Sequence, residues 1–223
     1  MKIKFVILAR TVWLFDLNLL NPQGRSIQGV LEKLGPQYRF ATSPRNPLDL
    51  DENKSLAFKL GTFTNSKAVS VGVSFNIYNN GVSAETSSST DDCTEFLLDV
   101  RSRLKSEFGL VIPDEEVKTA YVSQLMVESD ASLSALNPQI PKFIRLIESR
   151  VKRVDGTPSR FDVGAFNLWT EDVNQLMAPA MFRFERKHGT PFSSNDYFSQ
   201  APLQTQEHID VLDALGQILS GKM

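Results

Sequence analysis

The chain has 223 residues, of which 41% are hydrophobic and 22% charged, a composition that indicates a folded globular protein and excludes a disordered one. Its 24 basic and 26 acidic side chains give a net charge of -2, so no overall positive field marks it for nucleic acid or a membrane surface. The single cysteine, Cys93, excludes an intramolecular disulfide framework, and we expect a reducing, cytoplasmic location. Arg10 and Asp16 interrupt the apolar start, so we expect neither a signal peptide nor a membrane helix.

The first half of the chain is rich in predicted strands. β-branched and aromatic residues, or a period-two alternation of apolar residues, predict strands at 3–15, 38–42, 56–63, 69–78 and 82–86. Asn80-Gly81 favours a tight hairpin turn between the last two of these strands. We therefore expect the strands on either side of this turn to pair antiparallel.

Two helices are predicted in the same half. The first begins after Ser26, a good capping residue, and ends at Gly35-Pro36 because proline cannot continue the hydrogen-bond ladder. The second carries an apolar stripe over 93–108, with Asp92 and Glu95 in the spacing of a capping box and Gly109 after its last turn.

The second half of the chain predicts strands at 119–127, 161–169 and 181–186, and helices at 138–151 and from Thr205 onward. The segment 190–205 is interpreted as a long connector. Runs of antiparallel strands followed by helices predict an α+β fold in which helices pack on one face of the sheet. We expect an amino-terminal lobe at 1–112 and a carboxy-terminal lobe at 113–223, packed together as one globular unit.

Both halves show a strand, strand, helix order. One interpretation is an internal repeat produced by duplication of this unit, with Gly164-Ala-Phe166 matching Gly61-Thr-Phe63. The other interpretation is chance resemblance, because few residues are identical and the phase of the strands slips by one residue. Both interpretations stay open on the sequence.

A basic stripe is predicted on the helix at 138–151. At 100° per residue its cations lie opposite the apolar face, and the stripe continues past the helix: Lys142, Arg145, Lys152 and Arg153. Such a stripe can bind the phosphates of a nucleic acid. The alternative is a solvated face whose cations interact favourably with the helix dipole.

The connector at 190–205 is more aromatic than ordinary loops, because it contains Phe192, Tyr197 and Phe198. These side chains are candidate anchors for a protein partner. The alternative is a loop that packs its aromatic rings on its own sheet.

No local signature of catalysis is present in the sequence. It contains neither a phosphate-cradling glycine loop nor a serine-hydrolase motif, and the two histidines lack metal-ligand spacing. His208 lies on an apolar helix face and is predicted to be a hydrogen-bonded core residue. We therefore assign no catalytic residue, no metal ligand and no cofactor.

Three functions remain. The first is a non-enzymatic protein-interaction or structural subunit of a cytoplasmic assembly, with a protein partner or self-association into an oligomer. The second is nucleic-acid binding through the basic helix face. The third is an enzyme without a recognisable motif, built on a cleft between the two halves.

Overall fold

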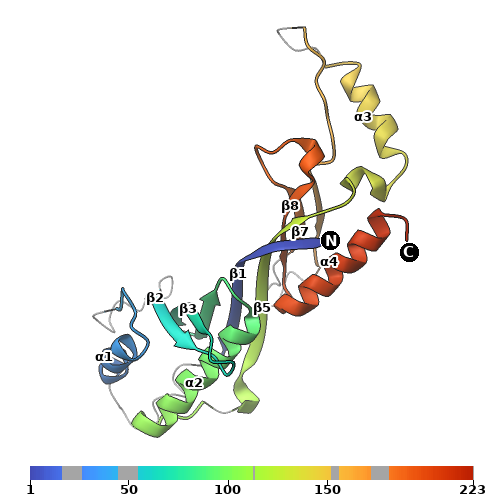
Figure 1. The fold of residues 1–223 in the computed structure, drawn as a ribbon. Helices are drawn as coiled ribbons and strands as arrows, with labels where there is room; N and C mark the ends of the chain where they lie inside the picture. Colours follow the sequence, from blue (N-terminus) through green and yellow to red (C-terminus); the bar gives the residue numbers. More distant parts are fainter. Residues whose placement is uncertain (17–26, 45–54, 113, 152–155, 172–180, 223) are drawn as a thin grey trace. The chain divides into compact units, whose positions relative to one another are not determined.

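The computed structural model describes residues 1–16, 27–44, 55–112, 114–151, 156–171 and 181–222 (Figure 1). The strands in this part of the chain are β1 (Lys2–Leu14), β2 (Leu56–Thr64), β3 (Ser70–Tyr78), β4 (Gly81–Thr86), β5 (Lys118–Glu128), β6 (Ala165–Leu168), β7 (Phe182–Arg186) and β8 (Asp196–Ala201). The α-helices are α1 (Ile27–Gln37), α2 (Thr90–Phe108), α3 (Ile140–Glu148) and α4 (Thr205–Leu219). Short 3-10 helices are η3 (Asp114–Glu116), η4 (Leu133–Leu136) and η5 (Phe192–Ser194).

The strands form one antiparallel sheet in the order β2-β3-β4-β1-β5-β8-β7-β6. The predicted α+β class is thereby confirmed. None of the described helices is both long and apolar enough to cross a lipid bilayer. The chain divides into two compact units, which are an amino-terminal unit (Val6–Ser123 with Pro202–Thr205) and a carboxy-terminal unit (Met1–Phe5, Gln124–Ala201 and Gln206–Met223).

The order of elements runs twice through strand, helix, three strands and helix, first from β1 to α2 and then from β5 to α4. The strand order reads the same from either edge of the sheet, with β2 corresponding to β6 and β1 to β5. This is a likeness of topology alone. It does not confirm the predicted duplication of a strand, strand, helix unit in the sequence.

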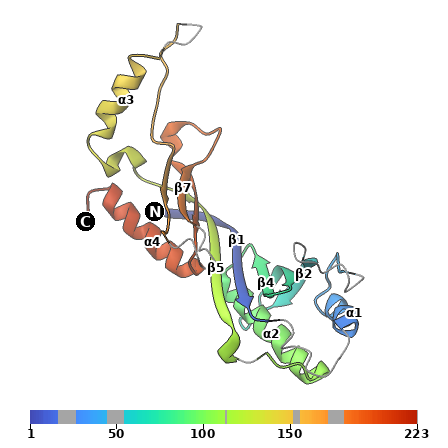
Figure 2. The ribbon, with the colours of Figure 1, turned by 180° about the vertical axis from the view of Figure 1, so that it is seen from behind.

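The core of the amino-terminal unit lies between α2 and one face of its strands. Alternate residues of β3 and β4 point into it, including Phe75 and Ala84, which are 2% and 0% exposed. The predicted stripe of α2 is confirmed, because Cys93 and Phe96 are both fully buried on this face. Burial raises the pKa of the Cys93 thiol to about 12, which leaves it without a reactive thiolate at neutral pH. Figure 2 shows the same strands from behind, with α2 on their far side.

The hairpin prediction is also confirmed: β3 and β4 pair antiparallel, with Ile77 opposite Val82 on either side of the turn. The start of α2 differs from the predicted capping box at Asp92 and Glu95. The N-cap is Ser89, whose side chain accepts a hydrogen bond from the Asp92 backbone N–H at 3.1 Å. Three consecutive polar residues precede the helix, so spacing alone did not identify which one caps it. Gly109 closes α2 in the left-handed conformation as predicted.

The predicted strand at 38–42 is wrong. Tyr38 and Arg39 form a turn after α1, and only Thr42 makes an isolated bridge, to Lys59 of β2. Helix α1 also runs one residue beyond Pro36, to Gln37. The apolar residues of this segment pack into the core from a turn, where burial does not require a strand. The predicted cap Ser26 lies outside the described residues.

The core of the carboxy-terminal unit forms where α4 covers β7 and β8. Phe184 and Tyr197 stack with ring centroids 4.6 Å apart, and Leu212 of α4 is fully buried in the same unit. The connector predicted at 190–205 is wrong, because it contains η5 and the strand β8. Within β8, Tyr197, Ser199 and Ala201 are buried and the residues between them are half-buried. This burial alternates with the period of two of a strand, although the segment is rich in residues typical of loops.

Candidate functional site

Helix α3 is strongly amphipathic and has no buried residue. Its apolar side chains repeat at helical spacing on one side: Ile140, Phe143, Ile144 and Ile147. Phe143 is 62% exposed, and Leu146, which lies beside it on the helix, is 54% exposed. Neither ribbon view shows a described strand or helix laid along α3 (Figures 1 and 2). We call Phe143, Leu146 and the three isoleucines the α3 apolar face.

The opposite side of α3 carries the first two residues of the predicted basic stripe. Lys142 and Arg145 are exposed, and neither forms an ion pair with any described residue. The helix ends at Glu148, earlier than the predicted limit of 151. Lys152 and Arg153, the other two residues of the stripe, lie outside the described part of the chain. The structure therefore describes only half of the predicted nucleic-acid site.

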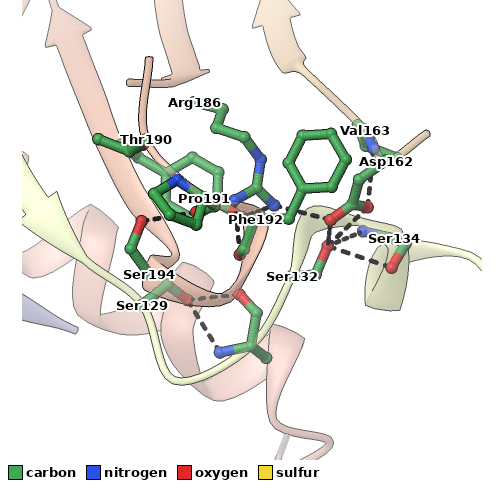
Figure 3. A network of polar contacts seen from close by, with 12 residues as sticks. Ser129, Ser132, Ser134, Asp162, Val163, Arg186, Thr190, Pro191, Phe192 and Ser194 are labelled. Carbon is green, nitrogen blue, oxygen red and sulfur yellow. Dashed lines mark hydrogen bonds and ion pairs between the residues drawn. The ribbon is translucent and has the colours of Figure 1, made fainter. Parts of the chain in front are cut away.

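The segment that carries α3 is held at both ends by a cluster around the buried side chain of Arg186 of β7 (Figure 3). The Arg186 side chain is 7% exposed, and its Nη2 atom donates to Asp162 Oδ2 at 2.7 Å. Asp162 follows α3 in the chain and also accepts hydrogen bonds from the Ser132 hydroxyl, at 2.9 Å, and from the Val163 N–H, at 2.8 Å. Ser132 precedes α3, so one carboxylate joins the outgoing and returning chain to the sheet.

Arg186 is also packed between aromatic rings. Its guanidinium carbon lies 5.0 Å from the ring centroids of both Phe192 and Tyr197, within the range of cation–π attraction. Nη1 donates to the Phe192 carbonyl at 2.9 Å, and Nη2 donates to the Tyr197 hydroxyl at 3.1 Å. These contacts connect η5, β8 and β7 around one buried cation. We call Arg186, Asp162, Ser132, Phe192 and Tyr197 the Arg186 cluster.

A further contact fixes the end of α3. The Phe161 N–H donates to the Glu148 carboxylate at 3.0 Å, which links the last residue of the helix to the returning chain just before Asp162. The α3 apolar face is therefore presented on a segment anchored near its two ends and at the helix terminus. A preorganised surface of this kind loses less conformational entropy on binding than a free loop does.

The three predicted protein anchors do not share one surface. Phe192 is 43% exposed, but Tyr197 is fully buried and Phe198 points to the opposite side of β8 from Tyr197. Because Tyr197 stacks on Phe184 and contacts Arg186, its ring contributes to the core. Of the three side chains, Phe192 is the most exposed.

His208 is fully buried, and its Nε2 atom lies 2.8 Å from the Ser199 hydroxyl oxygen. This confirms the prediction of a hydrogen-bonded core histidine. Both side chains are closed off from solvent, and the Ser199 hydroxyl also lies 3.3 Å from the Arg183 carbonyl, so the pair gives no nucleophile that a substrate could reach. Burial lowers the pKa of His208 to about 4.

This burial makes the stability depend on pH. Above pH 6.5 His208 is neutral in both the folded and the unfolded chain, so its contribution is complete. Between pH 6.5 and about 4 only the unfolded chain takes up the proton, and stability falls with pH by roughly 2–4 kcal/mol in total. We expect H208Q to lack this part of the decline when urea unfolding of both proteins is measured from pH 7 to 4. Parallel profiles for the two proteins would contradict the prediction.

Within the described ranges, no group of three or more histidine, cysteine, aspartate or glutamate side chains is arranged to hold a metal ion. The sequence did not identify the residues that organise the α3 segment. Asp162 and Arg186 are 24 positions apart, and only the pairing of β6 with β7 brings their segments together. A charged residue at the end of a strand was the available signal, and such residues are usually solvated.

Comparison with known proteins adds no family to this description: no protein-family model matches the chain, and no curated protein is found as a relative.

Proposed function

We propose that this chain is a non-enzymatic protein-interaction subunit of a cytoplasmic assembly, and that it contacts its partner through the α3 apolar face. The observation that supports this proposal most directly is the exposure of Phe143 and Leu146 on a strongly amphipathic helix with no buried residue. An amphipathic helix that packs on its own fold buries its apolar stripe. Exposed aromatic and aliphatic anchors on a fixed helix are typical of a helix that docks in a groove.

The charges around the face give the partner its expected chemistry. Lys142 lies next to Leu146 on the helix surface, and Arg145 lies further round, both without a described ion-pair partner. We therefore expect an apolar groove that accepts Phe143 and carries acidic side chains on the rim facing Lys142. Such rim charges affect association rate and specificity more than affinity.

The test compares partner recovery by the wild-type protein and by an F143S/L146S variant, each tagged and purified from the native host after nuclease treatment. Truncation of a central anchor typically costs 2 kcal/mol or more, so we expect the variant to bind the recovered partner roughly 30-fold or more weakly. Mass spectrometry identifies the partner, and binding of the purified proteins gives the affinities.

L98S is the matched control, because Leu98 is a 48% exposed leucine on α2 of the amino-terminal unit, whereas α3 belongs to the carboxy-terminal unit. This variant is expected to recover the partner as the wild type does. Loss of the partner in both variants would indicate general damage to the surface or the fold. Equal recovery by F143S/L146S and the wild type would contradict the proposed contact face.

Nucleic-acid binding is the alternative function, and it is favoured by Lys142 and Arg145, which are exposed and form no ion pair with a described residue. It predicts an affinity that falls steeply with salt and is reduced by K142A/R145A, whereas F143S/L146S leaves it intact. Recovery of nucleic acid in place of protein from the untreated extract would support this alternative. Absence of binding at low salt would remove it.

A further inference from the structure

Arg39 of the amino-terminal unit has an unusual backbone conformation. Its φ is +52°, in the left-handed region that ordinary L-residues seldom adopt. The turn is fixed on both sides, because the Arg39 N–H donates to the Pro36 carbonyl at 3.2 Å and the Tyr38 carbonyl accepts from the Thr62 N–H at 2.7 Å. Tyr38 is buried and Phe40 packs against the core, so the chain must turn sharply between them.

The folding of this turn does not account for an arginine. Glycine avoids the strain of this conformation, as at Gly109 (φ +64°), whereas Arg39 accepts it, as Leu60, Ala68 and Asn195 also do. The Arg39 side chain is exposed and has neither a hydrogen bond nor an ion pair to any described residue. Non-glycine residues in strained backbone conformations are often found at binding or active sites, where the side chain has a function.

Arg39 lines three hollows around the end of α1, with volumes of about 390, 460 and 910 Å³. The hollow of about 390 Å³, which we call the Arg39 pocket, also contains Arg103, Asp99 and the rings of Tyr38 and Phe63. Its volume is in the range of small-molecule sites. Three hydroxyl side chains complete its wall: Thr62, Thr64 and Ser70.

The charges in the Arg39 pocket leave one cation uncompensated. Asp99 Oδ2 accepts from Arg103 Nε at 3.0 Å and from the Tyr38 hydroxyl at 2.6 Å, so this carboxylate is already paired with Arg103. Burial and the Asp99 carboxylate hold the pKa of Tyr38 above its usual range, which keeps the phenol protonated and bonded to Asp99. The guanidinium of Arg39 is then the excess positive charge in the pocket.

The remaining wall supplies hydrogen-bond donors. The hydroxyls of Thr62, Thr64 and Ser70 form no side-chain hydrogen bond with any described residue. A guanidinium beside several hydroxyls that have no described partner matches the three acceptor oxygens of a phosphate group better than the two of a carboxylate. Phe63, which is half-buried, gives an apolar surface for an attached organic group.

We propose that the Arg39 pocket binds a phosphate monoester of a small organic group, with the Arg39 guanidinium as the principal anion ligand. The site lies on the amino-terminal unit and does not depend on the α3 contact proposed above.

The test is a titration of the isotope-labelled full chain with phenyl phosphate at low ionic strength, followed by amide chemical shifts. Saturable shifts are expected at Arg39, Thr62 and Thr64, with a dissociation constant below about 1 mM. R39G removes the guanidinium while suiting the left-handed turn, so we expect at least roughly tenfold weaker binding with an unchanged or higher melting temperature.

Two comparisons distinguish specific binding in the Arg39 pocket from general attraction of an anion to surface cations. K59Q removes an exposed cation of β2 that does not line the pocket, and it is expected to bind phenyl phosphate as the wild type does. Phenol, which lacks the anion, is expected not to bind, and inorganic phosphate is expected to bind more weakly than phenyl phosphate. The proposal is overturned if phenyl phosphate does not saturate, if R39G binds it as tightly as the wild type, or if inorganic phosphate binds equally well, which would indicate an adventitious ion only.

Discussion

Replacement of Arg186 by methionine is expected to lower the free energy of unfolding by about 3–5 kcal/mol, the usual cost of removing one partner from a buried ion pair. The Arg186 side chain is 7% exposed, and the substitution leaves the Asp162 carboxylate, which is 16% exposed, without its cation. It also removes the hydrogen bond to the Phe192 carbonyl. Urea unfolding at neutral pH measures the change.

The same strand provides a matched control. Arg183 is also on β7 and pairs with Glu185, but this pair is at the surface, with 39% and 31% of the side chains exposed. Exposed pairs contribute little, so R183M is expected to cost no more than about 1 kcal/mol. Equal losses in R186M and R183M would show that the Arg186 cluster does not anchor the α3 segment.

The second large effect is expected in the amino-terminal unit. Replacement of the fully buried Phe96 by alanine should cost about 3–5 kcal/mol, because the surrounding structure can fill only part of the space. The Phe96 ring lies 4.9 Å from the Tyr38 ring and 5.6 Å from the Phe75 ring, measured between centroids, and so joins α2 to both the turn after α1 and the sheet.

L98A serves as the control for F96A, because Leu98 is on the same helix but is 48% exposed. Its cost is expected to be within about 0.5 kcal/mol, as for most surface substitutions. The midpoint and slope of chemical unfolding measure both changes. An F96A loss as small as that of L98A would mean that the aromatic cluster is not the centre of this core.

The sequence was most informative where local pattern and local structure coincide. The β3–β4 hairpin follows from strict alternation around Asn80-Gly81, and α2 follows from an apolar stripe closed by Gly109. Prediction failed where apolar residues reach the core from an element of another type than the pattern predicts. Tyr38 and Phe40 reach the core from a turn, and the strand β8 was hidden among serine, asparagine and proline residues.

The candidate site was only partly predictable for the same reason. The periodicity of α3 was clear, and it placed Phe143 and Arg145 on opposite sides of the helix. Helical periodicity indicates which side is apolar but not whether another element covers it. The exposure of Phe143, the anchoring by Arg186 and the position of Arg39 in a pocket wall all depend on how distant segments pack.

Site-specific photo-crosslinking in the native host tests the proposed contact most directly. A photoreactive phenylalanine analogue is placed at position 143, on the α3 apolar face, and in a second protein at position 145, on the opposite side of the helix. A distinct protein adduct at position 143 that is absent or much weaker at position 145 is the predicted result. No adduct at position 143, or the same adducts at both positions, would contradict a partner bound to this face.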